Sequence, residues 1–120
     1  MNDIPEYIES IINENIISQE MIDKREEEYK SNKRDLNQMN SICQAKIQSC
    51  NDHYDYFHDG KLHVGLPSYE ALKWAFQQFS NAIAAKDYQR IASLDLIIEE
   101  IYRRLNETLE QLKAYKALIS

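Results

Sequence analysis

The chain has 120 residues, a net charge of −6, and only two glycines and two prolines. That length favours one domain, so we predict a single helical domain over residues 1–120. The scarcity of glycine and proline argues against a sheet protein, which needs many turns. The acidic balance argues against nucleic-acid binding and against docking on an anionic membrane, because both depend on lysine and arginine. The composition therefore predicts an all-α fold of long helices with few connections.

Acidic side chains gather in the first half of the chain. Residues 1–60 carry 13 acids and 6 bases, whereas residues 61–120 carry 7 acids and 8 bases. Six of the acids fall within the first 23 residues, which contain no lysine or arginine. An acidic segment of this kind either solvates a helix face or meets a basic surface on another protein.

The N-terminal residues are acidic where a secretion signal needs a basic segment, and no apolar run approaches the ~20 residues of a membrane span. Cys43 and Cys50 would lie ~10 Å apart along one helix, which is too far for a disulfide. Two cysteines without a secretion signal indicate a reducing compartment. We therefore expect a cytoplasmic protein with no membrane partner.

A heptad-like repeat runs through the first half of the chain. Its seven-residue steps land mainly on apolar side chains: Ile8, Asn15, Ile22, Tyr29, Leu36, Cys43, Cys50 and Phe57. This spacing predicts one helix from about residue 4 to residue 56. The middle of that helix, about residues 18–35, is poor in apolar residues.

Both glycines lie in the elbow that follows, residues 57–67. Asp59 and Gly60 form a strong tight-turn signal, so the elbow is either a short two-stranded ribbon or a loop. Ser68, placed directly after Pro67, is suited to cap a second helix over about residues 68–85.

The last segment has the most regular apolar pattern in the chain, with apolar residues at alternating steps of three and four. It predicts a helix over about residues 87–119, with Asp87 as its N-cap. The chain either breaks near Lys86 or continues as one helix through it. The predicted architecture is a long antiparallel helical hairpin, or a coiled-coil-like bundle, of two to three helices.

A mismatch in this hairpin suggests a binding surface. With the hairpin centred near residue 62, the stripe on the last helix faces about residues 19–33, the most polar part of the first helix. Exposed apolar strips usually mark interfaces, and exposed aromatic side chains often anchor them. The predicted partner-binding residues are therefore Ile91, Leu94, Ile98, Ile101, Leu105, Trp74 and Tyr69. The alternative is that the chain folds back at Lys86 and buries the stripe internally.

Other chemistry has little support in the sequence. The metal-ligating residue types around the elbow lack the paired spacing of a zinc site; they are Cys43, Cys50, His53, His58 and His63. No glycine-rich phosphate loop and no nucleophile elbow is present. We predict no catalytic residues, no metal site, no cofactor and no small-molecule substrate, and thus no enzyme.

The segment NAIAAKDYQRIASLDLIIEEIYRRL, residues 81–105, resembles the helix–turn–helix register of flagellar and type III export chaperones. The resemblance rests on Ala85, Asp87, Tyr88, Ile91 and Leu94. The leading functional hypothesis is a small adaptor, export-type chaperone or inhibitor that binds another protein through a coiled-coil-type contact. One alternative is a self-assembling structural protein, such as a homodimer, with no other partner. A Cys/His metal-binding protein is a third.

Overall fold

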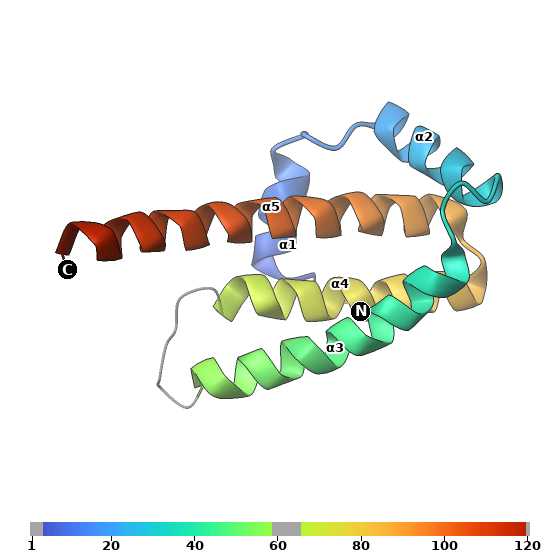
Figure 1. Cartoon of the computed structure of the whole chain (residues 1–120). Coiled ribbons are helices and arrows are strands. Elements are labelled where there is room, and N and C mark those ends of the chain that lie inside the picture. Colours follow the sequence, from blue (N-terminus) through green and yellow to red (C-terminus); the bar gives the residue numbers. More distant parts are fainter. Residues whose placement is uncertain (1–3, 59–65, 120) are drawn as a thin grey trace.

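Five helices make up the described part of the chain (Figure 1). The computed structural model describes the backbone of residues 4–58 and 66–119, and the side chains of residues 4–48 and 70–107. The helices are α1 (Glu6–Asn13), α2 (Gln19–Lys30), α3 (Leu36–His58), α4 (Leu66–Ala85) and α5 (Tyr88–Ile119). No strand occurs in these residues, so the all-α prediction is confirmed.

The single helix predicted for residues 4–56 is wrong, because the chain breaks there twice and forms α1, α2 and α3 in its place. A continuous helix of that length would be about 80 Å long at ~1.5 Å per residue. The long axis of the molecule measures 50 Å. The breaks fold the N-terminal segment back onto the rest of the chain, which shortens the molecule and covers surface that a straight hairpin would leave open.

Three helices end in the same way. The residue after the C-cap has a left-handed backbone at the ends of α1, α2 and α4, where Asn15, Asn32 and Lys86 have φ of 56°, 62° and 56°. Each donates its backbone N–H to a carbonyl three residues earlier. After α4, Asp87 also donates its N–H to the carbonyl of Ala82, which completes a Schellman motif. Asparagine tolerates this conformation better than most residues, which explains the stops at positions 15 and 32.

Polar caps start the helices that follow these stops. The Ser18 hydroxyl accepts a hydrogen bond from the N–H of Met21 at 3.2 Å, at the start of α2. Asp35 accepts one from Gln38 at 3.1 Å before α3. Asp87 accepts one from Arg90 at 3.2 Å before α5, as the sequence predicts. Each cap satisfies a backbone donor that the first turn of a helix leaves without a partner.

Lys86 is the least favourable of the three left-handed residues. A residue with a Cβ costs roughly 1–2 kcal/mol in this conformation, which glycine would avoid. Part of the stability gained in this way is lost because glycine makes the unfolded chain more flexible. We expect Lys86→Gly to raise the free energy of unfolding by about 1 kcal/mol, measured by urea titration. Asn32→Gly is the matched control and should give a smaller gain. A destabilised Lys86→Gly variant would contradict this account of the turn.

The helices are arranged as a core of three with an N-terminal arm laid over it. α3, α4 and α5 follow one another up and down, and α4 contacts both its neighbours. The N-terminal arm, which we define as residues 4–30, comprises α1, α2 and their connection. α2 lies against α5, and α1 crosses α4 and α5 (Figure 1). The break near Lys86 is therefore real, and it sends α5 back along α4.

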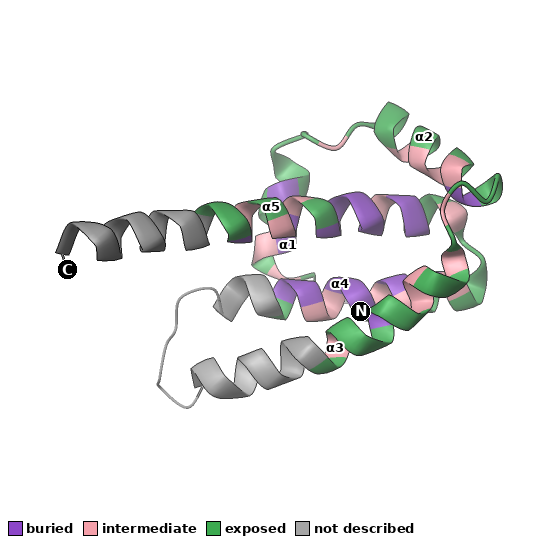
Figure 2. Cartoon of the chain, viewed as in Figure 1, coloured by how far each residue is buried: buried purple, intermediate pink, exposed green. Residues whose placement is uncertain are grey.

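Figure 2 shows the buried residues concentrated on α4 and α5. α4 contributes small and aromatic side chains, and the arm contributes two fully buried isoleucines from α1 and one tyrosine from α2. The core cluster contains Ile8, Ile11, Tyr29, Cys43, Ala71, Leu72, Ala75, Phe76, Phe79, Ala82, Ile91, Leu94, Ile97, Ile98, Ile101 and Leu105. Within residues 4–58 and 66–119, no helix combines the length and the apolar character needed to cross a membrane.

The later boundaries agree closely with the sequence. α4 begins at Leu66 rather than at Ser68, and α5 begins at Tyr88, next to the predicted start at residue 87. The elbow predicted for residues 57–67 narrows, since α3 continues to His58. Whether residues 59–65 form a ribbon or a loop lies outside the described residues.

Candidate functional site

The stripe assigned to a partner surface lies inside the molecule. Its side chains are between 0 and 8% exposed and belong to the core cluster: Ile91, Leu94, Ile98, Ile101 and Leu105. α2 does lie on α5, as the hairpin requires, but α4 runs back along α5 from the turn at Lys86 and brings its apolar face to the stripe. The premise that the stripe is exposed is therefore wrong. A partner could reach it only if the bundle opened.

The two predicted aromatic anchors lie on α4. Trp74 is partly buried and packs against the core cluster. The side chain of Tyr69 lies outside the described residues, although its backbone belongs to α4. The structure thus brings Trp74 to the core and leaves the contacts of Tyr69 undescribed.

A buried carboxylate on α5 joins the arm to the core. Asp95 is 4% exposed, and its Oδ2 accepts a hydrogen bond from Arg25 at 2.7 Å and one from the Tyr29 hydroxyl at 2.8 Å. Arg25 also donates to Glu99 at 2.8 Å, and an Arg34 nitrogen lies 3.9 Å from the same Asp95 oxygen. A buried carboxylate needs such partners, so this cluster fixes α2 on α5.

The titration of the cluster fits a structural role. Burial, with the charge and the hydrogen bond of Asp95, raises the pKa of Tyr29 well above its usual value. Burial lowers the pKa of Arg25, but its hydrogen bonds to Glu99 and Asp95 outweigh this effect and raise the pKa. Both groups therefore keep their protons at neutral pH and act as hydrogen-bond donors. Neither is set up to exchange a proton with a substrate near neutral pH.

Cys43 is fully buried on α3. Burial, followed by the negative charge of Asp95, raises the pKa of its thiol to about 12. Because the thiolate is the nucleophilic form, this cysteine is a poor nucleophile at neutral pH. Within the side chains that the structure describes, no group of three or more metal-ligating residues lies close enough to hold an ion. The side chains of Cys50, His53, His58 and His63 lie outside that part.

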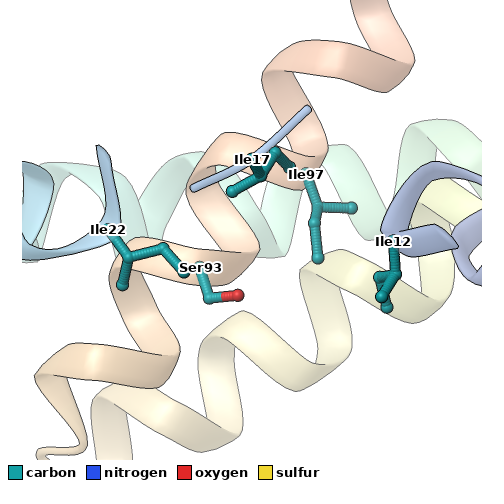
Figure 3. Close-up of a pocket in the computed structure, with 5 residues that line it drawn as sticks. All are labelled: Ile12, Ile17, Ile22, Ser93 and Ile97. Carbon is teal, nitrogen blue, oxygen red and sulfur yellow. The ribbon is translucent and has the colours of Figure 1, made fainter. Parts of the chain in front are cut away.

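An apolar cavity of about 200 Å³ opens between the arm and α5. Figure 3 shows Ile12 reaching it from α1, Ile17 from the connection and Ile22 from α2, with Ser93 and Ile97 on α5. Four of the five lining residues are isoleucines, and the Ser93 hydroxyl is the polar exception. We name this feature the arm cavity.

Exposed apolar side chains and acids lie near the lining residues along the arm sequence. Ile12, Ile16 and Met21 are 47, 43 and 41% exposed, and all three belong to the arm. Glu14 pairs with Arg104 of α5, which ties the end of α1 to the core. Hydrogen bonds from Gln19 and then Gln89 lower the pKa of Asp23, so this acid stays charged at neutral pH.

The arm cavity was missed in the sequence, although a signal for it exists. The N-terminal arm has two isoleucine doublets, at positions 11–12 and 16–17, and adjacent residues on a helix point in directions about 100° apart. On the short helix α1, Ile11 and Ile12 therefore point in different directions. In the structure Ile11 is fully buried while Ile12 is about half exposed.

Comparison of the chain with protein-family models, with curated proteins and with solved structures gave no match.

Proposed function

We propose that the chain is a small cytoplasmic protein-interaction module, acting as an adaptor, export-type chaperone or inhibitor, and that it holds another protein at the arm cavity. The observation that supports this is an isoleucine-lined cavity beside exposed Ile12, Ile16 and Met21. Apolar pockets with an exposed apolar rim are typical of protein interfaces. The coiled-coil seam on α5 is less suitable, because its side chains are buried in the core.

The size of the cavity favours a side chain of another protein over a metabolite. Ligand pockets usually span ~300–1,000 Å³ and contain several placed polar groups. The arm cavity measures about 200 Å³, and Ser93 is its one polar lining residue. A cavity of ~150 Å³ accommodates a benzene-sized group, so this one suits a single leucine, isoleucine or phenylalanine side chain.

The position of the cavity is well fixed. Asn15 stops α1 in a left-handed conformation, Ser18 caps α2, and Glu14 pairs with Arg104. The connection that carries Ile17 is therefore held at both ends and against α5. A surface arranged in advance loses less conformational entropy when a partner binds.

A peptide selection tests the proposal. Peptides selected from a displayed random library on the folded protein are expected to contain a large apolar residue, and their affinity is then measured by fluorescence anisotropy. Ile12→Ser removes about half of one buried isoleucine from the interface, roughly 1 kcal/mol, so the dissociation constant should rise about fivefold. The serine variant should stay folded, because Ile12 is 47% exposed in the free protein.

Ile42→Ser is the matched control. Ile42 is 37% exposed and lies on α3, away from the residues that line the cavity. Equal loss of affinity in the two variants, or no loss in Ile12→Ser, would show that the peptides bind elsewhere. A dimer of the wild-type protein that Ile12→Ser dissociates would indicate self-assembly.

A further inference from the structure

The surroundings of the arm cavity are acidic. Residues 4–23 contain five acids and no lysine or arginine. The acids alternate along the chain with the isoleucines that line the cavity. Glu9 precedes Ile12 by three residues on α1, which places the two on neighbouring positions of one helix face. Glu20 lies in the first turn of α2, the helix that brings Ile22 to the cavity.

Four of these five acids form no ion pair with a described side chain: Glu6, Glu9, Glu20 and Asp23. Glu9 and Glu20 are exposed, and neither forms an ion pair with any side chain in the described ranges 4–48 and 70–107. Glu14, in contrast, is paired with Arg104. Lys24 is the first cation in the chain. Carboxylates without a described cation, Glu9 and Glu20 among them, therefore lie on both helices, α1 and α2, that border the cavity.

We infer that the arm cavity takes a basic segment of another protein, with a large apolar side chain as anchor and lysine or arginine on both sides of it. The inference rests on the proposed function and adds the chemistry of the partner. The isoleucine lining selects the anchor, and Glu9 and Glu20 select the flanking cations by charge complementarity. Charges at the rim of an interface chiefly raise the association rate and reject wrong partners.

A second copy of this chain fits less well. In a two-fold dimer the same surface patch meets itself, so the arm of one copy would lie against the arm of the other. The charged side chains of residues 4–23 are all negative, so acids of one copy would face acids of the other. Like charges brought together at an interface disfavour association, which points to a partner of opposite charge.

The test uses the full chain and three fluorescent synthetic peptides of equal length. The first is lysine-rich with a central leucine, the second has glutamate in place of each lysine, and the third has serine in place of the leucine. Only the first should bind tightly, and raising the salt from low to physiological concentration should weaken it several-fold. Glu9→Gln/Glu20→Gln should weaken it about three- to tenfold.

Glu27→Gln/Glu70→Gln is the control, because it makes the same change in net charge at two exposed acids outside residues 4–23. It should change the affinity less than twofold. If the acidic and the basic leucine peptides bind equally well, or if the two double variants behave alike, the inference is overturned while the proposed function stands. If no leucine peptide binds, or if Ile12→Ser has no effect on a peptide that does, the proposed function fails as well.

Discussion

Replacing Ile98 with glutamate is expected to unfold the chain as a monomer. Ile98 is 7% exposed and belongs to the core cluster. The substitution forfeits ~1.5–3 kcal/mol of apolar burial and places a charge within the core cluster. Buried unpaired charges are among the few changes that cost more than ~4 kcal/mol, which is a large part of a typical stability of ~5–15 kcal/mol. Urea titration followed by circular dichroism measures the loss.

Ile12→Glu is the matched control. It introduces the same side chain on the arm, at a residue that is 47% exposed, so the change in the free energy of unfolding should stay below about 1 kcal/mol. A folded Ile98→Glu variant that differs from the wild type only in its oligomeric state would overturn the core assignment. It would also return α5 to the role of a partner surface.

Arg25→Met is expected to release α2 from α5. Among the described residues, the substitution leaves the Asp95 carboxylate, 4% exposed, with the Tyr29 hydroxyl as its one hydrogen-bond donor within 3 Å. Removal of one partner from a buried ion pair typically costs ~3–5 kcal/mol. The loss of unfolding free energy is limited here, because Tyr29 is the one buried residue of α2. If α2 undocked, Asp95 would return to water and would no longer be a buried unpaired charge. We therefore expect ~2–4 kcal/mol, measured by urea titration, with faster amide exchange confined to α2.

The double variant Arg25→Met/Asp95→Leu distinguishes the loss of the ion pair from the cost of leaving the Asp95 charge buried without a partner. Replacement of both partners by apolar side chains is often close to neutral, so the double variant should be more stable than either single one. Arg103→Ala serves as the surface control, since Arg103 and its partner Glu107 are exposed and the side chain should contribute at most about 1 kcal/mol. Additive losses in the double variant would contradict a buried pair at Asp95.

The heptad-like repeat in the first half of the chain predicted buried side chains more accurately than it predicted the extent of the helix. Ile8, Tyr29 and Cys43 lie on the heptad steps and are 0, 2 and 0% exposed. The continuous helix failed because local signals at Asn15 and Asn32 interrupt it, and periodicity does not register them. Asparagine at a left-handed stop, followed within a few residues by a serine or aspartate cap, marks each break.

The candidate site depended on contacts that sequence patterns do not contain. Asp95 interrupts an apolar run, so a pattern alone places it on an exposed edge. Its burial depends on Arg25, which lies 70 residues earlier in the chain. The arm cavity likewise forms only where the α1–α2 connection crosses α5, and that crossing follows from the two breaks. The doublet Ile11–Ile12 indicates two side-chain directions on α1, but it does not indicate what Ile12 would contact.

Because the N-terminal arm packs on α5, the order of synthesis affects how long the arm stays undocked. The arm is synthesised before its docking site, because Arg25 precedes Asp95 by 70 residues. At roughly 5–20 residues per second, that separation corresponds to about 4–14 s of synthesis. During this interval the buried faces of α1 and α2 have no core to cover. The acids of the arm give neighbouring nascent chains like charges in this segment, and we expect the resulting repulsion to disfavour aggregation of the unfinished protein.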